Sequence, residues 1–468
     1  MTGQYDLVVI GAGSGGLTAA QFAARLGAKV ALVEKERIGG DCTWTGCVPS
    51  KALLKAAKVA YEVRTAAHYG IYTDSPEVDM AKVHAYVQQA IAAVYQSETP
   101  QQLTDKGLDV VMGAAHFLDS HVIQVGERTL SAKKFIIATG AQPFIPPVPG
   151  ISEVPYVTYR QIFDNEQLPR RLLVLGAGPV GVEIAQAYRR LGAQVTLIGS
   201  SLLPREEPEV AEVMGRVFAR EGMQFIQGRV TAARREEAEI ILTVREQEFR
   251  GDMLLLAAGR APNVTGLDLE RAGVIYSPQG ILVDSQLRTN VKHIYAAGDC
   301  VQGNDQFTHL AGWQAFQAAR NALLPGSSRG FSNVVPWTTF TDPEVAHVGL
   351  TEAQARDKYG DTVRVALREM DRVDRAVCEN DQDGFIKVVH TKDGALLGAT
   401  IVAERAGEAI TEFVLALHHG LKLADLAEAI HVYPTYSAGV QQLAAQVATD
   451  SFLDSWLGRV VQMLTRPG

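Results

Sequence analysis

Near the start of the chain, the spacing of apolar residues changes from a strand pattern to a helical one and back. Tyr5 to Ile10 is a short, nearly continuous apolar run, Leu17 to Leu26 repeats with helical spacing, and Lys29 to Val33 is apolar again. A short continuous run suits a buried strand, and apolar residues three and four apart suit a helix. The pattern predicts a βαβ unit.

The glycine-rich turn inside this unit, Gly11-Ala-Gly13-Ser-Gly15-Gly16, has the spacing of a dinucleotide-binding site. Gly11 permits a tight turn, Gly13 lets a pyrophosphate approach the backbone, and Gly16 lets the helix and strand pack closely. The N-terminus of the following helix then faces the phosphates. Glu34 lies 18 residues after Gly16, the offset expected for a carboxylate that binds a ribose hydroxyl.

A second βαβ unit follows, with strands Arg171 to Leu175 and Gln194 to Ile198 around a glycine-rich turn that begins at Gly176. Two such units predict two dinucleotides. Counting 23 residues from the first glycine of each turn reaches Glu34 in the first unit and Gly199 in the second. Because no carboxylate stands there to repel a 2′-phosphate, the second site favours NADPH over NADH.

The residues after Gly199 point both ways on this choice of coenzyme. Ser200, Ser201 and Arg205 suit a phosphate, whereas Glu206 and its neighbour Glu207 would weaken a phosphate site. The preference for NADPH is therefore an expectation, and NADH remains the alternative.

Between the two units, Gly39 to Lys51 places Cys42 and Cys47 five residues apart, in a chain with only four cysteines. Two cysteines this close can form a disulfide, and Val48 to Val63 has the pattern of a helix that begins beside them. The partial positive charge of a helix N-terminus favours a thiolate, so a redox pair is the leading interpretation. A stabilising disulfide or two buried thiols are the alternatives, and a zinc site lacks a second pair of ligands.

Composition excludes several classes of function. The chain has 468 residues, 47% hydrophobic and 21% charged, which is typical of about three globular domains. Its net charge of −8 makes a nucleic-acid partner improbable, and no apolar run reaches the length of a membrane span. With a first strand at Tyr5 and no room for a signal peptide, we expect a cytoplasmic protein without membrane insertion, in which a disulfide would cycle.

The remaining pattern predicts the other elements. One or two helices are expected over 79–106, a strand over Asp109 to Phe117, another over Lys134 to Ile137, and a proline-rich linker over Gln142 to Pro149. Nearer the C-terminus, two apolar runs flank the turn Lys392-Asp-Gly394 and predict a hairpin of Phe385–His390 with Ala395–Val402. Helices are expected over Glu408–His418 and Leu423–Ile430.

Together these motifs resemble the FAD-dependent pyridine nucleotide-disulfide oxidoreductases, the family of dihydrolipoamide dehydrogenase, glutathione reductase and mercuric reductase. The resemblance implies an α/β fold with two Rossmann-like dinucleotide-binding domains and an α+β C-terminal dimerisation domain, hence a homodimer. The implied boundaries are 1–149 and 278–328 for the two parts of the FAD-binding domain, 150–277 for the NAD(P)H-binding domain and 329–468 for the dimerisation domain.

The resemblance also implies roles for individual residues. Cys47 would be the charge-transfer thiol and Cys42 the interchange thiol, while Lys51 would lie near the reactive nitrogen of the flavin and pair with Glu183. Residues implied at the FAD site are Gly11, Gly13, Ser14, Gly15, Gly16, Glu34, Lys35, Gly40, Asp41, Cys42, Lys51, Ala115, Thr139, Gly140, Asp299 and Ala311. Those implied at the NADPH or NADH site are Gly176, Gly178, Val180, Gly181, Ser200, Arg205 and Gly259.

One family signature is altered. The segment His431 to Ala438 aligns with the motif that carries a catalytic histidine and a glutamate in dihydrolipoamide dehydrogenase, but Tyr433 and Ala438 occupy those positions. A phenol is a poor base at neutral pH, although it can orient a ligand or donate a hydrogen bond, so Tyr433 is the candidate at this position. His431 is expected to be structural.

Comparison within the family favours the mercuric reductase branch, which also lacks that histidine. The additional cysteines of those enzymes are absent, and we interpret Cys300 and Cys378 as structural thiols with no resident metal site. We therefore expect an enzyme that passes electrons from NAD(P)H through FAD and the dithiol to a small-molecule acceptor: a metal, a quinone or a disulfide. The alternatives are a dihydrolipoamide dehydrogenase with a displaced base and a flavin redox sensor or assembly subunit without turnover.

Overall fold

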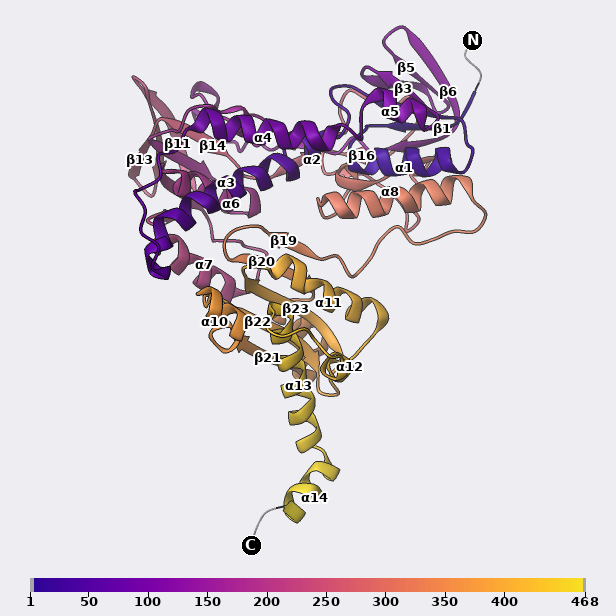
Figure 1. The fold of residues 1–468 in the computed structure, drawn as a ribbon. Helices are drawn as coiled ribbons and strands as arrows, with labels where there is room; N and C mark the ends of the chain where they lie inside the picture. The colour runs from indigo at the N-terminus through magenta and orange to yellow at the C-terminus, as the bar shows by residue number, and fades with distance from the viewer. Residues whose placement is uncertain (1–3, 466–468) are drawn as a thin grey trace. The chain divides into compact units, whose positions relative to one another are not determined.

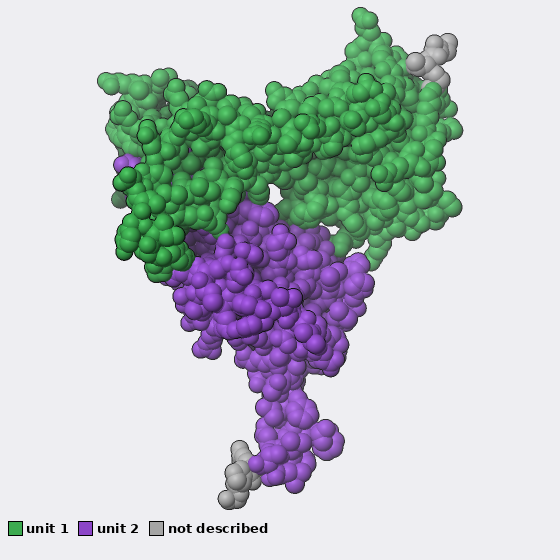
Figure 2. Space-filling view, in the orientation of Figure 1, with its two compact units in different colours: residues 1–176, 191–193, 230–332 green, residues 177–190, 194–229, 333–468 purple. Residues whose placement is uncertain are grey.

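The computed structural model describes residues 4–465, which form two compact units (Figure 2). Unit 1 comprises residues 1–176, 191–193 and 230–332, and unit 2 comprises residues 177–190, 194–229 and 333–468; the outermost residues of both fall outside the described part of the chain. Both units combine helices with sheets, which confirms the predicted α/β class. The four sequence-based domain boundaries stay a prediction.

The main sheet of unit 1 has the strand order β3-β2-β1-β6-β5-β4, and β18 pairs with β6 (Figure 1). Its strands are β1 (Tyr5–Ile10), β2 (Val30–Glu34), β3 (Leu108–Met112), β4 (Ala115–Asp119), β5 (Val122–Val125), β6 (Arg128–Ile137) and β18 (Ile294–Ala296). β1 lies in parallel between β2 and β6, so the predicted first βαβ unit is confirmed.

The α-helices of unit 1 are α1 (Ser14–Arg25), α2 (Gly40–Trp44), α3 (Cys47–Thr65), α4 (Met80–Tyr95), α5 (Pro100–Asp105) and α8 (Thr308–Leu323). The region expected to hold one or two helices therefore holds two. α1 and α8 lie side by side (Figure 1), and alanines on both helices are buried in the same cluster. Small side chains let the two helix backbones approach closely.

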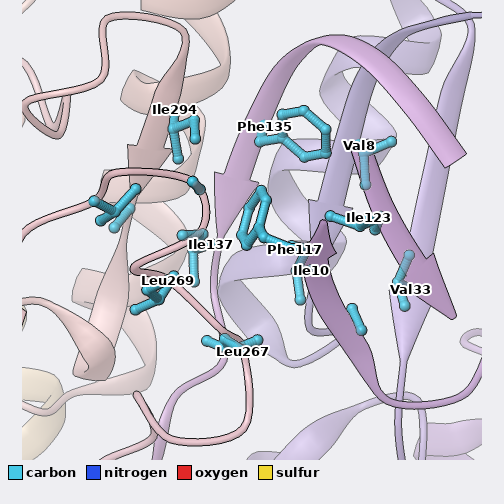
Figure 3. Packing of buried hydrophobic residues seen from close by; sticks show 14 of the residues in the cluster. Val8, Ile10, Val33, Phe117, Ile123, Phe135, Ile137, Leu267, Leu269 and Ile294 are labelled. Atoms are coloured by element: carbon cyan, nitrogen blue, oxygen red, sulfur yellow. The ribbon is translucent and has the colours of Figure 1, made fainter. Parts of the chain in front are cut away.

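Aromatic and branched side chains fill the core on one face of the main sheet (Figure 3). Phe117 and Phe135 pack edge to face with ring centroids 5.3 Å apart, and both are fully buried. Leu267 and Leu269 reach the same cluster from a later part of the chain. Burial of this apolar surface holds β18 and the following segment against the first dinucleotide-binding fold.

The strand expected over Asp109 to Phe117 is wrong as a single element. The structure divides it into β3, which pairs in parallel with β2, and β4, which pairs antiparallel with β5. Gly113 lies between them with φ +143°, and a β-carbon there would stand 2.9 Å from Val125 Cγ1. Because only glycine adopts this conformation without strain, the chain turns at this residue.

Unit 1 also contains smaller sheets. β8 (Arg171–Leu175) pairs in parallel with β14 (Met253–Leu256), and β11 (Val230–Glu236), β12 (Glu239–Val244) and β13 (Gln247–Gly251) form an antiparallel sheet. β16 (Tyr276–Ser277) pairs with β17 (Gly280–Ile281). The predicted linker begins as a strand, because β7 (Ala141–Pro143) pairs with β15 (Arg260–Pro262).

Unit 2 holds α6 (Pro179–Leu191) up to residue 190, followed by the parallel pair β9 (Gln194–Gly199) and β10 (Gln224–Gln227) with α7 (Pro208–Arg220) between them. Its second part is an antiparallel sheet of order β19-β20-β23-β22-β21. These strands are β19 (Trp337–Thr339), β20 (Glu344–Gly349), β21 (Val363–Glu369), β22 (Phe385–Thr391) and β23 (Leu396–Ala403). The predicted hairpin is confirmed as β22 and β23.

The helices that accompany this sheet are α9 (Glu352–Tyr359), α10 (Asp374–Glu379), α11 (Ala406–His419), α12 (Leu423–Glu428), α13 (Tyr436–Leu453) and α14 (Trp456–Thr465). α12 ends before the predicted Ile430. Short 3₁₀ turns are η1 (Ala66–Tyr69), η2 (Ile151–Glu153), η3 (Ile162–Asp164), η4 (Gly298–Cys300), η5 (Gly360–Thr362) and η6 (Met370–Arg372).

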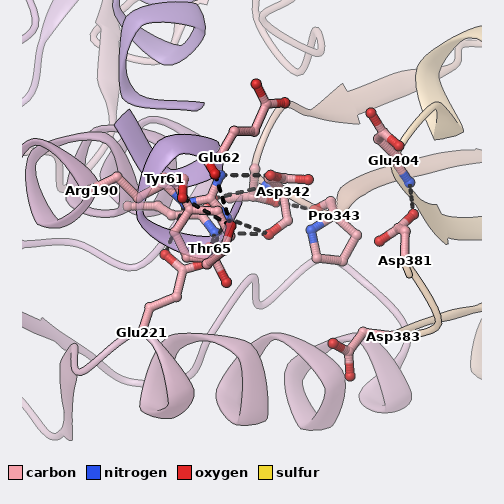
Figure 4. Close-up of polar contacts among 12 residues, drawn as sticks. Tyr61, Glu62, Thr65, Arg190, Glu221, Asp342, Pro343, Asp381, Asp383 and Glu404 are labelled. Carbon is pink, nitrogen blue, oxygen red and sulfur yellow. Dashed lines mark hydrogen bonds and ion pairs between the residues drawn. The ribbon is translucent and has the colours of Figure 1, made fainter. Parts of the chain in front are cut away.

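A buried arginine joins the two parts of unit 2 (Figure 4). Arg190 on α6 is 5% exposed and donates to Glu221 Oε1 at 2.6 Å and to Asp342 Oδ2 at 2.6 Å. Although burial opposes it, the hydrogen bond to Glu221 and the charge of Asp342 raise the pKa of Arg190. Because removal of one partner would leave a buried charge, this contact fixes α6 to the segment before β20.

Candidate active site

The first glycine-rich turn has the geometry that its sequence predicts. Gly11 has φ +101°, and a β-carbon there would stand 2.4 Å from the carbonyl oxygen of Ala138. A β-carbon on Gly16 would stand 1.7 Å from the carbonyl oxygen of Gly11. A β-carbon on Gly13, by contrast, would have only the Gly40 α-carbon within 4 Å, at 3.8 Å. Gly11 and Gly16 are thus required by packing, and Gly13 leaves room beside the start of α1.

Glu34 stands at the end of β2 and is 8% exposed. Its Oε2 accepts a hydrogen bond from the backbone N–H of Ala12 at 2.8 Å, and its Oε1 accepts one from Glu36 at 2.7 Å. Each oxygen keeps a further lone pair, which suits a ribose hydroxyl beside the turn. Lys35, also predicted at this site, is exposed and pairs with Glu36 at 3.2 Å.

The cysteine segment packs directly on this turn. The N–H of Gly39 donates to the carbonyl of Ala12 at 2.8 Å, and a β-carbon on Gly40 would stand 2.8 Å from the Gly13 α-carbon. A β-carbon on Gly46 would stand 2.7 Å from the Asp41 carbonyl oxygen. The glycines of this segment therefore bring both cysteines close to the dinucleotide turn.

Three helix N-termini meet at the two cysteines, which are not joined by a disulfide. Cys47 is the first residue of α3, and its Sγ lies 3.3 Å from the hydroxyl of Thr308, the first residue of α8. The thiol of Cys42 interacts with Cys47, Thr308 and Ser14, and Ser14 is the first residue of α1. Because each helix presents a partial positive charge here, the arrangement favours a thiolate in the pair.

The two thiols differ in environment. Cys42 is half-buried and Cys47 is exposed. The hydrogen bond to Cys47, and then burial, raise the pKa of Cys42, so Cys42 keeps its proton while the pair loses its first one. Which sulfur exchanges with an acceptor stays a prediction.

The sequence analysis missed a partly buried charge cluster beside the cysteines, of which it named only Asp41 and Asp299. Arg260 donates to Asp41 Oδ2 at 2.7 Å and lies 3.2 Å from Asp299 Oδ2. The hydroxyl of Tyr159 donates to Asp41 Oδ2 at 3.0 Å, and Arg160 lies 3.8 Å from Asp41 Oδ1. Sequence periodicity does not reveal such a cluster, because its members come from four distant segments.

Electrostatics in this cluster supports binding of an anion. Although burial opposes it, the charges of Asp299, Tyr159, Asp41 and Cys47 raise the pKa of Arg260. Burial raises the pKa of Asp299 against the effect of Arg260. The Nε atoms of Arg260 and Arg160 are buried without a hydrogen-bond partner. Unpaired guanidinium donors near a glycine-rich turn suit a phosphate-bearing cofactor.

The remaining residues predicted at the first site lie around the same turn. The hydroxyl of Thr139 donates to the Asn263 carbonyl at 2.7 Å, and the Gly140 carbonyl accepts from the Asn263 N–H at 2.9 Å. Ala311 stands in the first turn of α8, where a β-carbon on Gly15 would lie 3.2 Å from its carbonyl oxygen. Ala115 is buried at the start of β4.

The second glycine-rich turn begins in the same way in unit 1. Gly176 has φ +120°, and a β-carbon there would stand 2.2 Å from the Ala257 carbonyl oxygen. Gly259, after β14, has φ +127°. Both glycines are thus required by backbone geometry.

The rest of the second turn lies in unit 2. A β-carbon on Gly178 would meet nothing within 4 Å, so this position is open, as a dinucleotide site requires. Val180 is 39% exposed, and both it and Gly181 lie in the first turn of α6. At the ribose position, a β-carbon on Gly199 would stand 2.7 Å from the Ala177 β-carbon.

The predicted phosphate-binding residues after β9 have different surroundings. Ser200 is exposed, and its carbonyl accepts a hydrogen bond from Gln227 at 3.0 Å. The guanidinium of Arg205 lies over the Trp337 ring, 5.1 Å from its centroid. Trp337 also donates its indole N–H to Glu206 Oε1 at 2.5 Å. A role for Ser200 and Arg205 in coenzyme choice stays a prediction.

Lys51 and Glu183 are placed on separate helices of different units. Lys51, on α3, has its Nζ 3.4 Å from the Ser50 hydroxyl. Glu183, on α6, is buried and accepts a hydrogen bond from the Phe340 N–H at 2.9 Å. Their predicted pairing stays a prediction.

The altered signature contains a tyrosine and a histidine that precede α13. The hydroxyl of Tyr433 donates to Asp374 Oδ2 at 2.5 Å, and this hydrogen bond raises the pKa of Tyr433. His431 contacts Glu412 Oε2 through Nε2 at 2.7 Å and the Ala429 carbonyl through Nδ1 at 2.9 Å. Both ring nitrogens of His431 face acceptors, which favours the doubly protonated ring. Although burial opposes it, the hydrogen bonds to Glu412 and to the Ala429 carbonyl raise the pKa of His431.

Among residues 4–465, no cluster of three or more His, Cys, Asp or Glu side chains is arranged to hold a metal ion. None of the helices in this range is long and apolar enough to cross a membrane. Cys300 is fully buried, and burial raises the pKa of its thiol to about 11. Cys378 is exposed on α10. Ala438 lies in α13, and its N–H donates to the Thr435 hydroxyl at 3.1 Å.

Comparisons with known proteins agree with this site. Residues 5–320 match the family described as pyridine nucleotide-disulphide oxidoreductase, and residues 335–444 match its dimerisation domain. The chain is 35% identical over 452 residues to a mercuric reductase of Staphylococcus aureus, covering 94% of this chain and 82% of that protein. It is 34% identical over 479 residues to a dihydrolipoyl dehydrogenase of Haloferax volcanii, covering 98% of each.

Solved structures show the same fold. The HOCl-induced flavoprotein disulfide reductase RclA from Escherichia coli matches with a TM-score of 0.85 and 28% identity, covering 94% of this chain and 99% of that one. LpdA from Mycobacterium tuberculosis matches with a TM-score of 0.86 and 29% identity, covering 94% of this chain and 99% of that one.

Proposed function

The chain belongs to the pyridine nucleotide-disulphide oxidoreductase family, whose members use FAD and NAD(P)H, and from this membership we propose the path of its electrons. Electrons from NAD(P)H reach a small-molecule acceptor through the pair Cys42 and Cys47. Its dimerisation domain supports a homodimer.

The observation that supports this proposal is the meeting of three helix N-termini at two adjacent thiols. Ser14 and Thr308 contact the thiols from α1 and α8, and α3 begins at Cys47 itself. Such an arrangement stabilises a thiolate, the form that exchanges with disulfides and binds soft metals. FAD, when bound, accepts a hydride from NAD(P)H and passes an electron pair to the cysteine disulfide.

The dithiol can reduce an acceptor disulfide in two balanced steps. Cys42 gives up its proton as it attacks one sulfur of the acceptor; the S–S bond of the acceptor breaks, and the sulfur that leaves takes up that proton and departs as a thiol. Cys47 then attacks the Cys42 sulfur, closes the Cys42–Cys47 bond and releases the second thiol. The acceptor gains two electrons and two protons, and the cysteine pair loses them.

We rank a metal ion, a quinone or an uncommon disulfide above dihydrolipoamide as the acceptor. A dihydrolipoamide dehydrogenase needs a base where this chain has Tyr433, a phenol whose pKa is raised by its hydrogen bond to Asp374. His431 is a poor substitute, since acceptors at both of its nitrogens hold it in place and favour its protonated form, which is not a base. RclA, a structural relative, has been solved as a Cu(II) complex, which supports testing metals first.

The test is NADPH and NADH oxidation by the full-length holoenzyme with Hg(II), Cu(II), menadione, a model aromatic disulfide and lipoamide as acceptors. Cys42→Ser and Cys47→Ser should each lower reduction of metal or disulfide by a factor of about 10³, the scale on which loss of a reacting thiol acts. Cys378→Ser, which alters an exposed thiol on α10, is the matched control and should leave the rates unchanged. Rates that survive in both serine variants would contradict the proposal.

A dihydrolipoamide dehydrogenase is the second candidate, because the relative from Haloferax volcanii covers 98% of this chain and of itself. Its test is NAD⁺ reduction by dihydrolipoamide across pH 6 to 9. Robust turnover that is lost in Cys42→Ser would place this activity first. If turnover with dihydrolipoamide is slower than turnover with the metal or quinone acceptor, the proposed ranking stands.

A further inference from the structure

One short helix, α10, contacts both tyrosines of the altered signature through the carboxylates at its two ends. The hydroxyl of Tyr433 donates to Asp374 Oδ2 at 2.5 Å, and the hydroxyl of Tyr436 lies 3.0 Å from Glu379 Oε2. Asp374 is the first residue of α10 and Glu379 the last. Tyr433 is 65% exposed, whereas Tyr436 is 4% exposed. The buried Tyr436, which directly follows the segment 430–435, thus anchors its end, and the exposed Tyr433 lies within that segment.

Three carboxylates surround the Tyr436 hydroxyl. Besides Glu379, Asp381 Oδ2 lies at 3.1 Å and Glu404 Oε2 at 3.3 Å. A phenol has one proton to donate, so two of the three carboxylates face its oxygen without receiving that proton. The backbone N–H of Glu404 donates to Asp381 at 2.8 Å (Figure 4), which ties the end of β23 to the same cluster.

The positively charged side chains around the cluster lie closest to one of its three carboxylates. The guanidinium of Arg375 hydrogen-bonds Glu379, with Nε at 2.7 Å, and Arg405 lies 3.8 Å from the same carboxylate. Further charged groups near Asp381 are Asp342, which interacts with it electrostatically, and Asp383, which pairs with Arg220 at 2.6 Å. The cations therefore stabilise Glu379 as an anion.

The carboxylates consequently titrate differently. Although burial opposes it, hydrogen bonds from Arg375 lower the pKa of Glu379 to about 2. Burial, reinforced by the charges of Asp342 and Glu404, raises the pKa of Asp381 to about 6. Burial and the charges of Asp381 and Glu404 raise the pKa of Tyr436. Asp381 is thus the member that gains or loses a proton near neutral pH.

We propose that Tyr436 and Asp381 are positioning residues that hold the segment 430–435, and with it Tyr433, in an ordered conformation. The stability of that conformation depends on the protonation of Asp381. With that proton present, the cluster has a second donor and one fewer negative charge. When it leaves, the negative charge of Asp381 adds to that of Glu379 around one phenol, and the segment loosens. This inference rests on the proposed function only in linking the segment to turnover, since Tyr433 stands at the family's acid/base position.

The first test measures hydrogen–deuterium exchange of the backbone over 429–436 in the full-length holoenzyme, corrected for intrinsic rates, from pH 5 to 8. Exchange in the wild type should rise several-fold through about pH 6. Asp381→Asn, a neutral mimic of the protonated side chain, should remain slow at every pH. Asp381→Glu should restore the dependence, and Tyr436→Phe should exchange fast at every pH.

Asp383→Asn is the matched control, because it neutralises an aspartate two residues away that already pairs with Arg220. It should keep the wild-type dependence. Tyr276→Phe, which removes a phenol donating to Glu270 at 3.2 Å elsewhere in the chain, should also leave it unchanged. Equal pH dependence in the wild type and Asp381→Asn would overturn the proposal.

The second test separates this inference from the proposed function. For an acceptor reduced at the dithiol, kcat/KM in the wild type should fall several-fold as pH rises through about 6, with no such step in Asp381→Asn. Ferricyanide, which takes electrons without protons, is the comparison acceptor and should show no difference between the two proteins. If no acceptor turns over, the proposed function fails while the exchange experiment still decides the positioning role.

Discussion

Gly199 lies so close to Ala177 that a β-carbon on Gly199 would stand 2.7 Å from the Ala177 β-carbon. At the equivalent place in the first βαβ unit, Glu34 Oε2 accepts a hydrogen bond from the Ala12 N–H at 2.8 Å. The strand end and the glycine-rich turn therefore meet through a hydrogen bond in one unit and through direct packing in the other. The second site has no room for a ribose-binding acid unless its turn moves.

Gly199→Ala should destabilise unit 2 for this steric reason. Overpacking of a close contact costs about 1–3 kcal/mol, so the thermal midpoint followed by circular dichroism should fall by several degrees. The double variant Gly199→Ala with Ala177→Gly removes the opposing methyl and should recover most of the loss. An unchanged midpoint in the single variant would show that the turn yields freely.

Gly178→Ala, in the glycine-rich turn that Gly199 contacts, should leave stability unchanged but weaken coenzyme binding. A β-carbon there meets nothing within 4 Å, so the thermal midpoint should not change. The added methyl occupies the space that a pyrophosphate needs, and KM for NADPH should rise about tenfold, equivalent to about 1.4 kcal/mol of binding. KM for the acceptor is the internal control and should not move. A stable variant with unchanged KM would argue against a dinucleotide at this turn.

Anaerobic reduction by NADPH, and then by NADH, should show which of the two cysteines carries the thiolate. In the wild type, two-electron reduction should produce a long-wavelength charge-transfer absorbance that requires the Cys47 thiolate. Cys47→Ser should lack that band, whereas Cys42→Ser should show it before any reductant is added. NADPH should be effective at lower concentration than NADH, since the ribose position of the second unit is Gly199. Flavin bleaching without the band in the wild type would place the cysteines outside the main electron path.

Arg260→Met should destabilise unit 1 strongly, because it leaves two carboxylates without their shared cation. Arg260 lies 2.7 Å from Asp41 and 3.2 Å from Asp299 in a partly buried site, so its loss should cost less than the about 3–5 kcal/mol typical of a fully buried pair but more than loss of an exposed ion pair. The matched control is Arg250→Met, because Arg250 contacts three carboxylates, Glu236, Glu239 and Glu248, but on an exposed strand. Thermal midpoints of the two variants should differ clearly. Equal midpoints would show that the buried cluster contributes no more than the exposed one.

Local patterns in the sequence predicted the elements whose causes are local. The positions of the turn at Gly11 and of the acid at Glu34 follow from backbone geometry and spacing, and the structure brings the two together. Their binding roles stay predictions. The break at Gly113 was missed, because apolar residues stand on both sides of it while only the pairing strand changes, from β2 to β5. The Arg260 cluster could not be predicted, since it depends on which distant segments the fold brings together.

Glu206 and His347 should impose opposite pH dependences on the stability of unit 2. Burial raises the pKa of Glu206 to about 7, so the folded chain keeps a proton that the unfolded chain loses near 4.5. This contribution to stability is lost as pH rises from about 4.5 to 7. Burial lowers the pKa of His347 to about 4, so the unfolded chain binds a proton below 6.5 that the folded chain rejects. That contribution is lost as pH falls from 6.5 to 4.

Because the two trends oppose each other between pH 4.5 and 6.5, the wild type should be nearly insensitive to pH in this window. Glu206→Gln removes one trend and keeps an oxygen to accept the Trp337 indole N–H. Its unfolding free energy from urea titrations should therefore rise with pH by on the order of 2–3 kcal/mol across the window. Glu212→Gln, on the exposed side of α7, is the control and should behave as the wild type. If Glu206→Gln is as flat as the wild type, the two groups do not compensate, and Glu206 ionises within the fold without cost.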